Sequence, residues 1–402
     1  MTQTLPKGWK EKSLGDICLS VLDGDWIESK DQSSTGIRLI QTGNVGLGQF
    51  LNKEKKSRFI SEKTFNRLRC TEIFPGDCLV SRLPDPIGRS CLLPALPARM
   101  ITAVDCSILR FDKKQILPQY FIYHTLRSEY YRTVLKESTG ATRKRISRKK
   151  LMTLPIPVPP LSEQKRIVEK LDKIFANIDK AKEQTTQNLK NVQEVFEARM
   201  DSILKPHSDW HNVKMSEVCD VRDGTHDSPK YIKSGFPLVT SKNLKNGTLV
   251  FDNIKYICQE DYDHINERSK VDIGDVLFAM IGTIGNPVVV TEEPRYAIKN
   301  MALFKHSKEI LPSFLKYILE SRVVLDKMQK EANGTTQKFV SLGYLRNFII
   351  SLPSIKQQSD IIKELDSLRT KTQELEKIYT KKLADLDELK QSVLQQAFSG
   401  KL

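Results

Sequence analysis

The sequence has little that would support metal or disulfide chemistry. Its seven cysteines are an odd number, are scattered along the chain and form no CxxC pair. Zinc fingers and disulfide frameworks need paired cysteines at set spacings, so this pattern argues against both and predicts a reducing compartment. The six histidines show no spacing typical of metal ligands, and we predict no metal site.

Long apolar runs are missing as well. No stretch reaches the roughly 20 apolar residues that a membrane-spanning helix needs. The first residues, MTQTLPKGWKEK, lack the apolar core of a signal peptide. These features predict a soluble, cytoplasmic protein with no membrane partner.

Motifs of two large enzyme classes are absent. The chain has no GxxxxGK[ST] phosphate loop, and its terminal SGKL lacks the glycines that would precede one. It has neither the glycine-rich loop nor the Asn/Asp-Pro-Pro-aromatic tetrapeptide of an amino-methyltransferase that uses S-adenosylmethionine. We therefore predict no catalytic residue and no cofactor in this chain.

Positive charge, in contrast, is abundant. The chain has 64 Lys and Arg against 49 Asp and Glu, which gives a formal net charge of +15. Such an excess indicates a polyanionic partner, most simply nucleic acid. The alternative from charge alone is a basic surface without a specific partner.

The chain also contains an internal repeat. Shifted by 194 positions, KESTGATRKRIS (136–147) matches KEANGTTQKFVS (330–341), and IPVPPLSEQKRIVEKLD (156–172) matches ISLPSIKQQSDIIKELD (350–366). Earlier in each half the match continues with small insertions, and Asp23-Gly24 pairs with Asp223-Gly224. So many matches in the same order indicate a duplication.

Each copy has two parts. The first consists of short alternating apolar runs separated by Gly and Pro, which is typical of short strands, turns and a few helices. The second has the pattern of one long helix. The sequence therefore predicts an α+β protein with two similar globular domains, at residues 1–154 and 206–348. Each is followed by a joint and a long helix, at 155–205 and 349–402.

Both long helices carry apolar residues at alternating steps of four and three, a heptad pattern typical of coiled coils. The predicted seams are Ile167, Leu171, Ile174, Ile178, Ala181, Thr185, Asn188, Val192 and Val195, and Ile361, Leu365, Leu368, Thr372, Leu375, Tyr379, Lys382, Leu386, Leu389 and Val393. Parallel and antiparallel pairing are both topologically possible. We predict antiparallel pairing, because it relates the two copies by a pseudo-twofold axis, as in symmetric DNA readers.

The proline-rich segment PIPVPP (155–160) precedes the first long helix. Proline lacks an N–H donor and has a fixed φ, so we predict that this segment joins no sheet ladder and forms a stiff exit from the globule. Ser162 is the expected N-cap of the helix, with Glu163 in its first turn. The second joint keeps Pro353 but has Gln357 in place of the acid.

Basic and polar loops are the candidate DNA contacts. Arginine and lysine bind phosphates, arginine also reads guanine edges, and glutamine reads adenine. The candidates are Arg143, Lys144, Arg145, Arg148 and Lys149 in the first basic loop, Thr336, Gln337 and Lys338 in its counterpart, and, more weakly, Arg82, Asn44, Lys242 and Asn243. The alternative is that the charges are solvated and that the strand-end residues cap turns.

The complete pattern resembles one family. Two variable globules, the joint IPVPPLSEQKRIVEKLD, a long helix and the terminal SVLQQAFSGKL are similar to the specificity subunit of Type I restriction–modification systems. The similarity covers the whole chain, although the second joint departs from the usual pattern at Ser354 and Gln357. It implies two target-recognition domains, each binding one part of a split DNA site, with the helices setting the number of unread base pairs.

The resemblance also implies partners. These are double-stranded DNA, two copies of a methyltransferase subunit that carries S-adenosylmethionine and flips out the target adenine, and restriction/translocase subunits. On this hypothesis the chain is no enzyme but recognises a bipartite, asymmetric target and directs the catalytic subunits to it. Two alternatives stay open: a coiled-coil adaptor that binds other proteins without DNA specificity, and the specificity part of a single-chain enzyme, against which the missing motifs argue.

Overall fold

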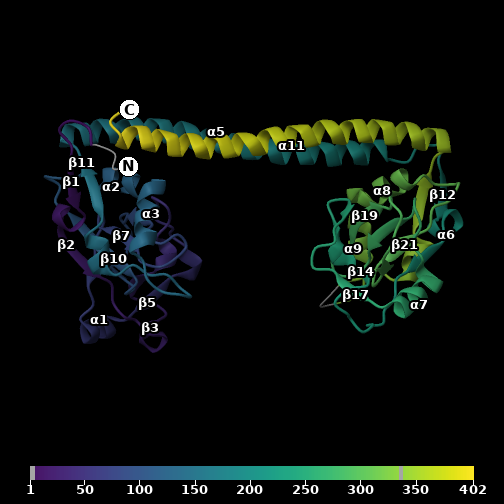
Figure 1. The fold of residues 1–402 in the computed structure, drawn as a ribbon, viewed down its shortest axis with the longest axis horizontal. Helices are drawn as coiled ribbons and strands as arrows, with labels where there is room; N and C mark the ends of the chain where they lie inside the picture. The colour runs from purple at the N-terminus through teal and green to yellow at the C-terminus, as the bar shows by residue number, and fades with distance from the viewer. Residues whose placement is uncertain (1–4, 335–337) are drawn as a thin grey trace. The chain divides into compact units, whose positions relative to one another are not determined.

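The structure is a computed structural model that describes residues 5–334 and 338–402. These residues form two compact units, one built from residues up to 185 together with 381–402, the other from 186–380. Each unit contains one globule and a stretch of both long helices, α5 (Leu161–Ile203) and α11 (Ile355–Phe398) (Figure 1).

The first globule contains a four-stranded antiparallel sheet in the order β2-β10-β7-β8 and a five-stranded sheet in the order β3-β5-β4-β9-β6. The strands are β1 (Lys10–Ser13), β2 (Cys18–Asp23), β3 (Gln32–Ser33), β4 (Ile37–Ile40), β5 (Arg58–Ile60), β6 (Glu72–Ile73), β7 (Cys78–Ser81), β8 (Ser90–Leu92), β9 (Met100–Thr102), β10 (Cys106–Phe111) and β11 (Pro155–Val158). The helices are α1 (Glu62–Leu68), α2 (Pro118–Thr125), α3 (Ser128–Glu137) and α4 (Arg148–Met152).

The second globule repeats this plan, with a four-stranded sheet β13-β21-β18-β19 and a three-stranded sheet β17-β14-β20. The strands are β12 (His211–Lys214), β13 (Val221–Asp223), β14 (Phe236–Val239), β15 (Leu244–Lys245), β16 (Thr248–Leu249), β17 (Lys255–Ile257), β18 (Val276–Ala279), β19 (Gly285–Val289), β20 (Ala297–Ile298), β21 (Ala302–Phe304) and β22 (Ile349–Leu352). The helices are α6 (Met215–Val218), α7 (Gln259–Ser269), α8 (Pro312–Glu320), α9 (Arg322–Glu331) and α10 (Leu342–Asn347). The shared strand order and the mixed α+β content agree with the predicted duplication.

The central strands of the two four-stranded sheets are buried on both faces. Every residue of β7 (CLVS) and of β18 (VLFA) is buried, which explains their continuous apolar runs. The helices α2 and α8 pack on these sheets, and each begins with a proline at its first position, where a missing N–H costs nothing. The same local signals therefore build the same core twice.

The proline-rich joint does pair in a sheet, so our prediction that it joins no ladder is wrong. β11 runs antiparallel to β1, with Ile156 opposite Lys12 and Val158 opposite Lys10. Only alternate residues of an edge strand need their N–H for the ladder, and Pro155 and Pro157 alternate with Ile156 and Val158. The proline-free strand β22 pairs with β12 in the same way.

A buried glutamine holds the joint. The predicted N-cap at Ser162 is wrong, because α5 already begins at Leu161. Gln164 is fully buried and accepts a hydrogen bond from the Leu117 N–H at 2.8 Å. Its amide donates to two backbone carbonyls, those of Gln115 (2.8 Å) and Pro159 (2.9 Å). Gln164 thereby fastens the first turn of α5 to the entry of α2.

Gln358 makes the corresponding bonds in the second unit. It accepts from the Leu311 N–H at 2.8 Å and donates to the carbonyls of Glu309 and Pro353, each at 3.0 Å. The departures at Ser354 and Gln357 therefore leave this fastening intact. A tyrosine–aspartate hydrogen bond adds to it in each unit, from Tyr123 to Asp172 and from Tyr317 to Asp366.

The two long helices pair antiparallel, as predicted, and this is visible within each unit. In the first, Lys182 contacts Asp387 at 2.6 Å and Lys390 contacts Asp179 at 3.0 Å. In the second, Arg199 contacts Glu364 at 2.8 Å, and the Arg369 guanidinium lies over the Phe196 ring, 4.8 Å from its centroid. In both units residue numbers rise along one helix as they fall along the other.

The predicted seam is correct for most apolar positions and wrong for some. Leu171, Ile178 and Val393 are buried, but Val195 is 59% exposed, and its neighbour Phe196 packs with Met200 in its place. Leu375, Lys382 and Leu389 of α11 are also exposed. A strict heptad drifts relative to a helix of 3.6 residues per turn, which accounts for such one-residue shifts. Along the described chain, no helix is both long and apolar enough to cross a membrane.

Candidate nucleic-acid interface

Three strand ends meet at one edge of the four-stranded sheet in each globule. In the first, Asp23 at the end of β2 pairs with Ser107, and Ser81 at the end of β7 pairs with Cys106 at the start of β10. We call this end of the sheet, which is formed by Asp23, Ser81 and Cys106, the first sheet edge. The second sheet edge is formed by Asp223 and Phe278, which both pair with Ala302 at the start of β21.

The first basic loop, residues 138–147, connects α3 to α4 and has a defined shape. The candidates Arg148 and Lys149, which the sequence placed in this loop, lie in the first turn of α4. The backbones of Thr139 and Arg145 exchange two hydrogen bonds, of 2.9 and 2.8 Å, which close the loop. Gly140 lies between them at φ +112°, and a Cβ there would be 2.5 Å from the Arg143 carbonyl oxygen. Glycine is therefore required, and the loop presents its side chains from a fixed backbone.

Two arginines hold this loop on the first sheet edge. The Arg145 guanidinium lies 2.8 Å from Asp105, and the Arg148 Nε lies 3.7 Å from Asp23. The exposed Arg143, Lys144 and Lys149 have no carboxylate within 4.0 Å among the residues that the structure describes. These three charges are available to phosphates, while Arg145 and Arg148 also position the loop.

The second loop occupies the corresponding place. Asn333 and Phe339 exchange two backbone hydrogen bonds of 2.9 Å, and the Gly282 N–H donates to the Lys338 carbonyl at the second sheet edge. The Lys338 ammonium donates to the Gln329 carbonyl at 3.1 Å. The candidates Thr336 and Gln337 lie outside the described residues.

The candidates Asn44 and Asn243 cap turns. The side-chain oxygen of Asn44 accepts from the Gln41 N–H at 2.9 Å, and its amide donates to the Leu51 carbonyl at 2.8 Å. Asn243 makes the equivalent bonds with Thr240 and Val250, at 3.0 and 2.9 Å. The turn-capping alternative thus describes their contacts in the structure, while the neighbouring Lys242 is exposed.

Arg82 is a brace inside the first sheet edge. It is only 5% exposed, donates to the Val104 carbonyl and lies 3.4 Å from Asp23. Burial lowers the pKa of its guanidinium. The nearby Arg89 is also buried and donates to four backbone carbonyls, those of Thr42, Val45, Leu83 and Pro86. Both arginines shape the loops, and little of either is exposed to a ligand.

One exposed aromatic residue at the first sheet edge escaped the sequence argument. Trp26 is 70% exposed, three residues beyond Asp23. The signal was present in the aligned pairs Asp23-Gly24 and Asp223-Gly224, because both copies continue for two residues to a ring: DGDW in the first and DGTH in the second.

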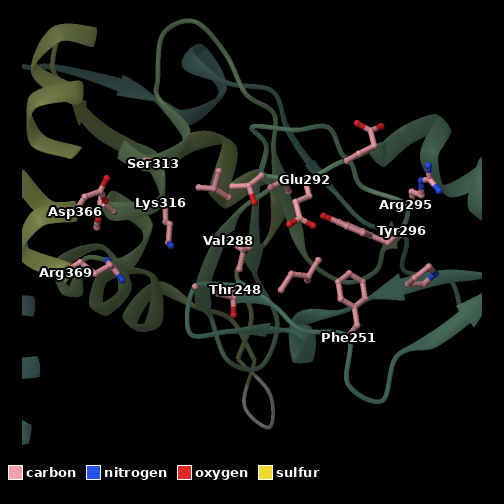
Figure 2. Close-up of a pocket in the computed structure, with 18 residues that line it drawn as sticks. Thr248, Phe251, Val288, Glu292, Arg295, Tyr296, Ser313, Lys316, Asp366 and Arg369 are labelled. Atoms are coloured by element: carbon pink, nitrogen blue, oxygen red, sulfur yellow. Dashed lines mark hydrogen bonds between the residues drawn. The ribbon is translucent and has the colours of Figure 1, made fainter. Parts of the chain in front are cut away.

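A pocket of about 770 Å³ lies elsewhere in the second unit, between α8, α11 and the loop after β19 (Figure 2). Its helix-side charged groups already have partners: Arg369 pairs with Glu320, Lys316 lies 3.8 Å from the same carboxylate, and Asp366 accepts a hydrogen bond from Tyr317. Across the described chain, no group of three His, Cys, Asp or Glu side chains is placed to hold a metal ion.

The family model for the Type I restriction modification DNA specificity domain matches this chain twice, over residues 6–191 and 207–384. The chain belongs to this family. Each match covers one globule and most of the helix that follows it, so the repeat found in the sequence corresponds to two copies of the family domain.

The named relatives of this specificity subunit cover most or all of the chain. It is 27% identical over 361 residues to the Type I restriction enzyme EcoBI specificity subunit of Escherichia coli, covering 82% of this chain and 74% of that protein. It is 26% identical over 429 residues to the EcoKI specificity subunit of E. coli strain K12, covering 99% and 90%. The family recognises DNA targets and is generally non-catalytic.

Solved structures share the fold. A chain from a study of complex assembly and conformational transition of the type I R-M system superposes with a TM-score of 0.80 at 19% identity, over 99% of this chain and 100% of that one. The HsdS subunit from Thermoanaerobacter tengcongensis superposes with a TM-score of 0.60 at 18% identity, over 100% and 99%. The fold class predicted from the sequence is thereby confirmed.

Proposed function

We propose that this specificity subunit reads a bipartite, asymmetric DNA target, one part with each globule. The observation that carries the proposal is that the same sheet edge and the same loop-closing backbone pair occur twice in one chain, while the loop sequences differ. In the aligned sequences, Arg143 and Arg145 of the first loop match Gln337 and Phe339 of the second, while Lys144 matches Lys338. One scaffold with two sets of surface groups is suited to two different short sequences.

In this proposal the chemistry belongs to partner subunits. A methyltransferase subunit would carry S-adenosylmethionine and modify adenine, and restriction/translocase subunits would complete the nuclease. The duplicated joint, fastened by Gln164 and again by Gln358, offers two equivalent helix–globule surfaces. Two equivalent surfaces support two copies of the methyltransferase subunit.

The test is DNA binding by the complex assembled with the methyltransferase subunit from the same host. The probe is a duplex that carries the target mapped from methylated adenines in that host. Affinity should fall steeply as salt rises, with a log–log slope of about −0.9 for each phosphate contacted. A complex that binds this duplex no better than a scrambled duplex at every salt concentration would refute the proposal and favour a coiled-coil adaptor.

A further inference from the structure

Each sheet edge continues into a short segment with the same backbone path. The segments are DGDW (residues 23–26) and DGTH (residues 223–226). A Cβ on Gly24 would lie 2.3 Å from the Ala103 carbonyl oxygen, and one on Gly224 would lie 2.4 Å from that of Ile298. The backbone in both copies therefore packs too closely against its neighbour for any side chain at the glycine.

Backbone hydrogen bonds hold both segments in the same way. In the first unit, the Gly24 N–H donates to Cys106 at 3.0 Å and the Asp25 N–H to Thr102 at 2.8 Å. In the second unit, the Gly224 N–H donates to Met301 at 2.9 Å and the Thr225 N–H to Ile298 at 3.0 Å.

The residue that follows is exposed in both copies: Trp26 by 70%, and the His226 side chain by 55%. The two rings therefore occupy equivalent positions on equivalent, rigid supports.

Trp26 lies beside the anchors of the first basic loop. The carbonyl of the preceding Asp25 accepts from the Val104 N–H at 2.9 Å, and the next residue, Asp105, binds Arg145 at 2.8 Å. Asp23, three residues before Trp26, lies 3.7 Å from Arg148. Trp26 therefore lies in the same part of the first sheet edge as Asp23 and Asp105, the carboxylates that hold the basic loop.

The chemistry of Trp26 suits an uncharged contact with a nucleic acid. Its N–H faces the Glu28 carboxylate at 3.4 Å, and most of its ring is exposed. An exposed indole beside a basic surface can pack on a thymine methyl group or a sugar, and such a contact releases no counterions.

His226 offers a cationic ring at the equivalent place. Its Nε2 lies 2.8 Å from the Asp223 carboxylate and its Nδ1 lies 2.9 Å from the Asn300 side-chain oxygen, so both nitrogens face acceptors. The hydrogen bond to Asp223 raises the pKa of His226 most, and the bond to Asn300 raises it further. Burial and the Arg268 guanidinium, which also pairs with Asp223, oppose this rise. The protonated ring is therefore the form that its surroundings favour.

We propose that Trp26 and His226 are equivalent DNA-contacting residues with different modes of contact: the first domain presents an uncharged ring and the second a cationic ring. The inference rests on the DNA-reading function proposed above and assigns a specific position within it.

The test compares Trp26→Ala and His226→Gln in the assembled complex, on the duplex that carries the mapped target. Trp26→Ala should weaken binding roughly tenfold with an unchanged salt slope, and Trp26→Phe, which keeps a ring, should recover part of the loss. His226→Gln should reduce the magnitude of the salt slope by about 0.9. Wild-type affinity should fall as pH rises through the pKa of His226, and His226→Gln should remove that fall.

Matched controls separate these effects from general ones. Leu19→Ala removes another exposed apolar side chain, 75% exposed on β2, and His264→Gln removes another exposed histidine, on α7. Neither should change affinity, salt slope or pH dependence.

Wild-type affinity in Trp26→Ala, or an unchanged salt slope and pH profile in His226→Gln, would overturn the inference while leaving the proposed function intact. Loss of target binding by the wild-type complex would instead overturn the proposed function, and the inference with it.

Discussion

Among single residues, ion pairing and burial separate the basic groups that stabilise the fold from the exposed charges that have no acidic partner in the described part of the chain. Arg82 and Arg89 are buried against backbone carbonyls, and Arg145 is paired with Asp105. Arg143 and Lys144 are exposed and lack an acidic partner in the described part of the chain. Composition indicated a polyanionic partner, but only the structure separates these roles, because pairing with a carboxylate from another strand leaves no local sequence signal.

The double variant Arg143→Ala/Lys144→Ala should therefore weaken DNA binding by the assembled complex. We expect a loss of about tenfold and a salt slope smaller in magnitude by about 1.8, as for two phosphate contacts. Lys113→Ala/Lys114→Ala is the matched control, because these exposed lysines follow the opposite end of β10. Equal losses in both variants would show that total charge, and not this loop, determines affinity.

His124 makes the stability of the first unit sensitive to acid. It is buried beside Phe398 and Tyr130, and burial lowers its pKa from 6.5 to about 3. Between these values the unfolded chain binds more protons than the folded one, so stability that is complete above about pH 6.5 is lost as pH falls toward 3.

Urea unfolding at pH 7 and pH 5, followed through Trp9 in the same core, should show this loss. His124→Phe should make the difference between the two pH values smaller, and His264→Phe, at an exposed histidine, should leave it unchanged. An identical pH difference in wild type and His124→Phe would contradict the assignment.

At the level of elements, the joints are the most specific construction in the chain. Two fully buried glutamines, Gln164 and Gln358, each satisfy one N–H and two carbonyls at the start of a long helix. A buried amide with all its partners fixes geometry, because any displacement leaves polar groups unpaired.

Gln164→Leu keeps the volume of the side chain and removes these bonds. It should lower the free energy of unfolding of the first unit by about 2 kcal/mol, since buried backbone groups lose their partners. Gln184→Leu, at an exposed position of α5 in the same unit, should change it by less than about 0.5 kcal/mol. A stability loss no larger in Gln164→Leu than in Gln184→Leu would show that the joint is held by other contacts.

The elements also show what sequence can and cannot predict. The repeat, the α+β content and the two long helices follow from periodicity and internal matching. The antiparallel direction does not, because parallel pairing was topologically possible too, and it was predicted for the pseudo-twofold axis that it creates. The strand formed by Pro155–Val158 was missed, because we took the missing N–H of proline to exclude any sheet pairing. An edge strand needs only alternate N–H groups for its ladder, so it can contain proline at the other positions. Val195 was misplaced because Phe196, one position on, offers a larger apolar surface to Met200.

For the molecule as a whole, the connection between the domains is the property most directly tied to a split target. Deleting Glu183–Thr186 shortens α5 by about 6 Å and shifts its seam by about half a heptad. We expect a changed spacing between the two parts of the target, or loss of assembly with the methyltransferase subunit. Replacing the same four residues with alanine keeps the length and should keep the spacing. A shortened chain that assembles and methylates with unchanged spacing would show that this helix does not set the distance.

The proposed function requires that one chain reads two separate parts of a DNA target. Its most direct test is a genome-wide map of methylated adenines in a host that lacks other adenine methyltransferases and expresses this chain with its methyltransferase partner. We expect a split, asymmetric sequence whose two specified parts are separated by a constant number of unspecified base pairs. A single contiguous methylated sequence, or methylation that persists unchanged when this chain is absent, would contradict it.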